Sequence, residues 1–193
     1  MAAALLLTGY NLWDQRRAET SAQQVLAEME PMLPEQEPVS EETPEDPLEV
    51  EIPDYILNPS MEMPTVTVEG EEYIGVVEIP ALGLSLPVMS QCSDANLKLA
   101  PCRYVGSAYQ ENMVISGHNY RSHFGSLRKL QPGDEVRFRD VDGNLFAYTV
   151  AAVETLSGYA VEEMEAGNWP LTLFTCTMGG QNRLTVRCIA ATE

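Results

Sequence analysis

Residues 171–187 read LTLFTCTMGGQNRLTVR, and this stretch decides the fold of the chain. The residues before Cys176 are β-branched, aromatic or leucine, as in a buried strand. After the two glycines, polar and apolar residues alternate from Arg183 to Arg187 with the period of two that a half-buried strand requires. We therefore predict two antiparallel strands joined by a short loop, which places Cys176 and Arg183 at the same edge of a sheet.

A cysteine beside an arginine is a candidate nucleophilic site. The thiolate rather than the thiol is the nucleophile, and a neighbouring cation favours the thiolate. Arginine stays charged, and its planar fork of donors suits a developing oxyanion. The chain contains two histidines, His118 and His123. A metal site made by these two would lack further ligands nearby in the sequence, so we expect neither a metal nor a cofactor.

His118 is the better candidate for the general acid and base. It stands in MVISGHNY, residues 113–120, where an apolar strand gives way to glycine and a polar loop. His123 lies five residues further on, inside that loop. Arg187 is the second candidate for the cation, although we expect it to be an exposed charge on its strand.

These residues resemble the motifs of the sortases, the cell-surface cysteine transpeptidases of Gram-positive bacteria. The chain has a Gly-His pair after an apolar strand at Gly117 and His118, TLFTC at residues 172–176, and an arginine shortly afterwards at Arg183. The intervening FGSL and QPGD sequences are also similar to family sequence. The resemblance covers residues 73–190 and implies an eight-stranded β-barrel.

The resemblance also implies a mechanism. Cys176 would attack the sorting signal of a surface protein, similar to Leu-Pro-x-Thr-Gly, while Arg183 holds the oxyanion. His118 would protonate the leaving amine and then deprotonate an amine acceptor, such as a cell-wall precursor or a pilin, that resolves the thioester. Thr175 would bind substrate through its backbone or hydroxyl. Two alternatives remain: a cysteine endopeptidase that hydrolyses its thioester, and an inactive extracellular peptide-binding barrel.

Many short candidate strands support a mainly β fold, a β-barrel with short helices. Further strands are predicted at residues 73–79, 84–88, 113–116, 135–139 and 145–153. The pair Asp142 and Gly143 marks a hairpin between the last two. Short helices are expected near residues 93–100, 124–130 and 161–168.

We expect three segments: an N-terminal membrane-anchor remnant or helix (1–27), an extended acidic, proline-rich linker (28–70) and the catalytic barrel (71–193). The net charge is −18, and residues 1–72 carry 2 basic and 17 acidic side chains, so the acidity belongs to the N-terminal part. Proline and like charge favour an extended spacer. We expect no nucleic-acid partner.

Residues 1–13 are apolar but too few to cross a bilayer, which needs about 20. We interpret them as the outer end of a membrane anchor or signal segment, with an ordinary helix of a soluble protein as the alternative. The resemblance then implies a location at the outer face of the cell membrane. Residues 52–57 are apolar enough to dock on the barrel, and a lid like that of some pilus-building sortases is one option.

The remaining details concern cysteines and subclass. Cys92 and Cys102 flank a candidate helix and could form a disulfide or be buried thiols. Cys188 alternates with apolar residues and is expected in the core.

The short segment 155–171 favours a compact class A or class D enzyme over class B, which carries a larger insertion there, but the subclass stays open.

Overall fold

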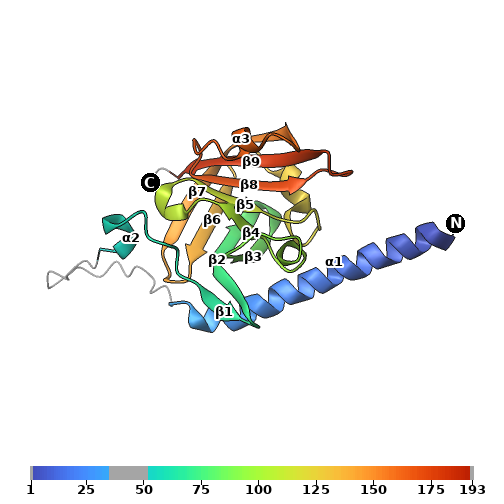
Figure 1. Ribbon diagram of the computed structural model, residues 1–193, viewed down its shortest axis with the longest axis horizontal. Helices are drawn as coiled ribbons and strands as arrows, with labels where there is room; N and C mark the ends of the chain where they lie inside the picture. The colour runs from blue at the N-terminus through green and yellow to red at the C-terminus, as the bar shows by residue number, and fades with distance from the viewer. Residues whose placement is uncertain (1, 35–51, 192–193) are drawn as a thin grey trace.

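A closed eight-stranded β-barrel forms the centre of the protein, whose computed structural model describes residues 2–34 and 52–191 (Figure 1). The order around the barrel is β2-β3-β4-β5-β8-β9-β7-β6, and β6 pairs back with β2. The strands are β2 (Glu71–Ile79), β3 (Leu84–Met89), β4 (Cys102–Val105), β5 (Met113–Ser116), β6 (Glu135–Asp140), β7 (Leu145–Ser157), β8 (Leu171–Cys176) and β9 (Asn182–Ala190). The predicted mainly β, eight-stranded barrel is confirmed.

The helices are short except for the first. They are α1 (Ala2–Met29), η1 (Glu30–Met32), α2 (Asp54–Leu57), η2 (Pro80–Leu82), η3 (Asn96–Lys98), η4 (Ala108–Gln110), η5 (Phe124–Lys129) and α3 (Val161–Met164). The expected helices near 93–100, 124–130 and 161–168 correspond to η3, η5 and α3. A ninth strand, β1 (Val66–Val68), pairs with the first residues of β2.

The barrel closes where Gly75 of β2 lies against β6. Gly75 pairs with Asp140, and a Cβ built on Gly75 would lie 2.1 Å from the backbone oxygen of Arg139. No side chain fits at that approach, which explains the glycine. Inside, the strands contribute a continuous apolar core that includes Cys188, as predicted. Burial raises the pKa of the Cys188 thiol to about 12.

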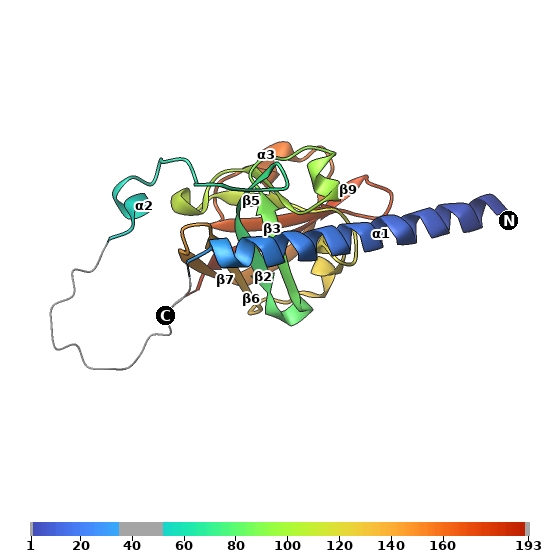
Figure 2. The same ribbon diagram turned by 90° about the horizontal axis from the view of Figure 1, so that it is seen from below.

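Helix α1 packs on the outside of the barrel. Ala18, Ala22, Val25 and Met29 form a stripe along one helix face, and all four are buried. The stripe contacts β1 and β3. The N-terminal end of α1 projects beyond the barrel (Figures 1 and 2). Within residues 2–34 and 52–191, no helix has the length and apolar character needed to cross a membrane.

The expected division of the chain differs from these elements at two places. Helix α1 and η1 reach Met32, so part of the expected linker 28–70 is helical and packed, and β1 adds to the sheet before the expected barrel start at residue 71. Residues 35–51, the acidic centre of that linker, lie outside the described residues. Because α1 already contacts the barrel, this segment connects two docked parts of the chain.

Helix α2 docks at one end of the barrel. Tyr55 stacks on Tyr109 with ring centroids 4.7 Å apart, and its ring centroid lies 5.3 Å from that of Phe146. Tyr109 precedes β5 and Phe146 stands near the start of β7, whereas the predicted catalytic histidine follows the other end of β5. Tyr55 thus docks on the barrel, whereas Ile52, Ile56 and Leu57 stay exposed, so the apolar side chains of residues 52–57 do not pack as expected. The contact lies at the end of the barrel away from the predicted site.

His123 is fully buried near α1. Neither ring nitrogen has a hydrogen-bond partner among the described residues. The pKa of His123 is lowered to about 4, mainly by burial and secondly by the charge of His118, while the nearby Ala18 backbone opposes the shift. The folded protein therefore holds His123 in its neutral form.

Cys92 and Cys102 meet in a second apolar cluster between α1 and the barrel. Both thiols are free, with Cys102 buried and Cys92 half-buried. A hydrogen bond between them lowers the pKa of Cys92. The pKa of Cys102 is raised, mainly by the same hydrogen bond and secondly by burial. The pair is therefore placed for oxidation.

Protonation of His123 should destabilise the fold at acid pH. The unfolded chain protonates this imidazole near pH 6.5 and the folded chain only near pH 4, so stability is lost as pH falls between these values. From pH 7 to 4.5 we expect His123 to contribute a loss of about 2–3 kcal/mol in the free energy of unfolding. Urea denaturation of wild type and His123→Gln measures it, because the variant lacks this titration. Equal losses in both proteins would contradict the assignment.

Mild oxidation should join Cys92 to Cys102. Oxidised glutathione would accept the two electrons, and the two thiols would lose two hydrogen atoms as the S–S bond forms. Peptide mapping after alkylation should find this pair linked, Cys176 alkylated and Cys188 protected by burial. Cys102→Ser is the control, since it should leave Cys92 alkylated or mixed with glutathione. A bridge from Cys92 to Cys176 in the wild type would show that the contact is misassigned.

Candidate active site

Strand β8 brings the predicted residues to one edge of the barrel. It lies between β9, which is antiparallel to it, and β5, which is parallel. Cys176 is the direct register partner of Arg183. Ser116 pairs with Phe174, so His118 follows β5 at the level where Cys176 ends β8. Neighbouring strands lie about 4.8 Å apart, which places the three residues on three adjacent strand ends.

Cys176 is the last residue of β8, and it is exposed while the rest of the strand is buried. Its thiol is free and lines a groove of about 330 Å³ on the outer face of the barrel. The groove walls are mainly apolar, and their large apolar residues are Leu97, Tyr104, Val161, Met164 and Phe174. Tyr104 packs edge-on against Phe174, with ring centroids 5.4 Å apart. A nucleophile therefore stands beside a surface suited to an apolar peptide.

Arg183 lines the same groove and is held by the β8–β9 loop. Its Nη1 donates to the carbonyl of Gly180 at 2.9 Å and to that of Asn182 at 3.2 Å. Gly158 supports this loop from the other side, since its N–H donates to the Gln181 carbonyl at 2.9 Å. Backbone groups thus orient the guanidinium in the groove that the thiol also lines, where a cation can stabilise negative charge.

His118 is positioned by a tight turn. The Gly117 N–H donates to the Phe174 carbonyl at 3.0 Å, and a Cβ on Gly117 would lie 2.4 Å from the Phe124 ring, so glycine is needed there. The half-buried imidazole stacks on Tyr120, with centroids 3.9 Å apart and planes 3° apart. His118 is not among the residues that line the groove. The sequence alone did not single out Tyr120, whose ring packs flat against this imidazole.

The other candidate residues lie away from the groove. Thr175 is buried, its hydroxyl has no hydrogen bond among the described residues, and it points to the opposite face of β8 from Cys176. This favours a role for its backbone over its hydroxyl. His123 is buried near α1, so His118 remains the better candidate for the acid and base. In the part of the chain that is described, no three His, Cys, Asp or Glu side chains form a group that could hold a metal ion.

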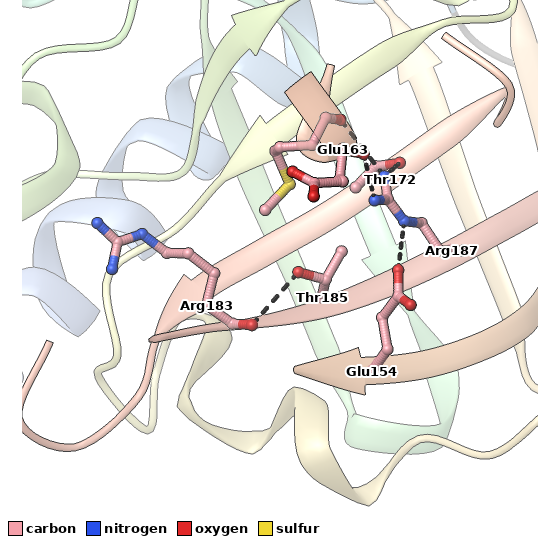
Figure 3. A network of polar contacts seen from close by, with 7 residues as sticks. Glu154, Glu163, Thr172, Arg183, Thr185 and Arg187 are labelled. Carbon is pink, nitrogen blue, oxygen red and sulfur yellow. Dashed lines mark hydrogen bonds and ion pairs between the residues drawn. The ribbon is translucent and has the colours of Figure 1, made fainter. Parts of the chain in front are cut away.

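Arg187 is buried, and the expectation of an exposed strand charge is wrong. Only 3% of the residue is exposed. Figure 3 shows its guanidinium turned toward Glu154, Glu163 and Thr172, while that of Arg183 extends away from this network. The two arginines of β9 thus have different surroundings. Only Arg183 lies at the groove.

The barrel is similar in sequence to known sortases. The model of the Sortase domain matches residues 77–191. Sortase A of Bacillus anthracis is 26% identical over 121 residues, which cover 60% of this chain and 57% of that protein. The chain therefore matches less than two thirds of the length of this relative.

Solved structures are similar to the same region. Sortase C1 from Streptococcus suis is 26% identical with a TM-score of 0.54, covering 63% of this chain and 74% of that one. Sortase A from Corynebacterium diphtheriae is 22% identical with a TM-score of 0.56, covering 64% of this chain and 62% of that one. Since the Sortase domain model spans more than half of the residues, the chain belongs to the sortase family.

Proposed function

We propose that this chain is a cysteine transpeptidase that cleaves a C-terminal sorting signal similar to Leu-Pro-x-Thr-Gly and joins it to an amine. The observation that carries the proposal is the exposed Cys176 thiol facing Arg183 across the β8–β9 pair, beside an apolar groove. His118 follows the adjacent parallel strand. Cys176 supplies the nucleophile, Arg183 the hydrogen-bond donor for the oxyanion, and His118 the general acid and base.

The mechanism assigns one role to each residue. The Cys176 thiolate attacks the scissile carbonyl carbon, and Arg183 donates to the oxyanion that forms. His118 gives a proton to the leaving amine, the C–N bond breaks, and a thioester remains on Cys176. The incoming amine attacks the thioester, His118 takes its proton, and the thiolate leaves. One amide replaces another, so the cycle consumes no oxidant, reductant or cofactor.

The shape of the groove supports a peptide substrate. Its apolar walls suit the leucine and proline of a sorting signal, and only Asp94 and Arg183 bring charge to its lining. The β7–β8 connection holds a single helix, α3, of four residues. This short connection favours a class A or class D enzyme over class B.

Helix α1 supports a tether at the outer face of the membrane. Its N-terminal end projects away from the barrel (Figure 2). Trp13 is 59% exposed, and the Arg17 guanidinium lies 5.6 Å from the centre of its ring. An exposed tryptophan suits the interface of a bilayer. The acceptor amine would then belong to a cell-wall precursor or a pilin.

Intact-mass spectrometry tests the function. The protein is incubated with a small library of sorting peptides, with and without an amine such as triglycine. A transpeptidase should show a thioester adduct on Cys176 and, with amine, a ligated peptide. Cleavage without ligation would identify an endopeptidase, and binding without an adduct would identify an inactive peptide-binding barrel; either result would overturn the proposal.

Removal of the nucleophile or the cation should reduce activity to different extents. Cys176→Ala should abolish the adduct and lower turnover by about 10³-fold or more. Arg183→Ala should lower kcat by about 10²-fold, because one oxyanion donor is lost. Arg128→Ala, an exposed arginine on η5, is the matched control and should behave as wild type. A Cys176→Ala protein that still cleaves sorting peptides would exclude the assigned mechanism.

The ring of Tyr120 should affect catalysis through His118. Tyr120→Leu keeps apolar volume but removes the flat face on which the imidazole stacks, so kcat/KM should fall by about tenfold and its pH profile should change. Tyr120→Phe retains the stack and should stay within about twofold of wild type. Steady-state kinetics from pH 5 to 9 measure both. Identical profiles for Tyr120→Leu and wild type would show that stacking does not position the base.

A further inference from the structure

Arg187 connects three elements through one buried guanidinium. Its Nε donates to Glu154 of β7 at 2.8 Å, and its Nη1 donates to Thr172 of β8 at 3.0 Å. Nη1 also donates to the Met164 carbonyl at 3.3 Å, and Nη2 to the Glu163 carbonyl at 2.6 Å. All three nitrogens therefore have partners. These partners offset the free-energy cost of removing the cation from water, which would be high for a buried charge without them.

The partners on α3 are the reason that this contact matters. Glu163 and Met164 are the last two residues of α3, and carbonyls at the end of a helix have no partner within the helix. Arg187 supplies donors to both. A helix of four residues has little stability of its own, so its place on the barrel depends on such contacts.

Helix α3 forms one wall of the groove beside Cys176. Val161 and Met164 line the groove, as does Ala160 just before the helix. Below α3, Met164 packs in a small apolar cluster with Val114 and Phe174 on the outer face of the sheet. The cluster supplies apolar contact, and Arg187 supplies the directional bonds. A displacement of α3 would change the width of the groove without moving Cys176, which is fixed in β8.

We propose that Arg187 is a positioning residue that holds α3 at the distance from β8 needed to bind the substrate peptide, and thereby determines substrate affinity without touching the peptide. The proposal rests on the proposed transpeptidase function. Its effect should appear mainly in KM, because the thiol, the imidazole and Arg183 belong to other contacts. Lysine should not replace it, since a single ammonium cannot bond at once to a carboxylate, a hydroxyl and two carbonyls arranged around a planar fork.

The test combines kinetics with hydrogen exchange on the full chain. Arg187→Lys should raise KM for a sorting peptide by about tenfold and leave kcat within about threefold. Amides of residues 158–169 should exchange faster, while those of β8 keep their protection. Alkylation of Cys176 by iodoacetamide should proceed at the wild-type rate. Arg137→Lys is the matched control, because Arg137 is a half-exposed strand arginine paired with Glu135, and it should leave all three measurements unchanged.

A second variant keeps the test independent of folding. Glu154 is half-exposed and its carboxylate pairs with Arg187, so Glu154→Gln preserves an acceptor and removes the charge. It should raise KM by about threefold and loosen residues 158–169 to a lesser extent. Unchanged KM and unchanged exchange in both variants would overturn the proposal, as would a fall in kcat at constant KM.

Failure of the proposed function would look different. In that case the wild type itself would form no adduct with any sorting peptide, whereas hydrogen exchange would still report whether Arg187 holds α3. Faster exchange at residues 158–169 in Arg187→Lys without any wild-type adduct would retain the structural role and reject the enzymatic one. An adduct in the wild type with identical KM in Arg187→Lys would retain the transpeptidase function and reject the effect of Arg187 on substrate affinity.

Discussion

The pairing of β8 with a strand on each side is the constraint on which the site depends. Hydrogen bonds to β9 place Arg183 opposite Cys176, and hydrogen bonds to β5 place His118 beyond the same edge. Register is costly to change, because a shift by one residue would move every buried side chain of β8 to the wrong face. The packing that stabilises the barrel therefore also fixes the relative positions of the proposed nucleophile, cation and base.

The helices and loops outside the barrel lie on different sides of this edge. Helix α3 forms a wall of the groove and is hydrogen-bonded to Arg187, while Tyr120 of the β5–η5 turn stacks on His118. Helix α2 contacts the opposite end of the barrel through Tyr55. Helix α1 packs beside β1 and β3. The groove is consequently left open by the described segments that precede the barrel.

Much of the fold could be predicted because short strands carry local signals. The hairpin at Asp142 and Gly143 and the alternation after Gly180 correspond to β6–β7 and β9. Strands β1 and β4 were missed, since they are short and mix polar with apolar residues, unlike the equally short but mostly apolar β5. The docking of α1 was also missed: its apolar stripe is made partly of alanines, which predict a helix but not the surface that it will meet.

The sequence by itself predicted a mainly β fold and the pairing of Cys176 with Arg183, because strand periodicity and a hairpin loop are properties of adjacent residues. The resemblance to the sortases added the eight-stranded barrel and His118 as the candidate base. Only the tertiary structure decided that Arg187 is buried, that Tyr120 stacks on His118 and that His123 lies near α1. These outcomes join parts of the chain far apart in sequence or depend on side-chain packing. The energies of burial and hydrogen bonding that select them exist only once the barrel has closed.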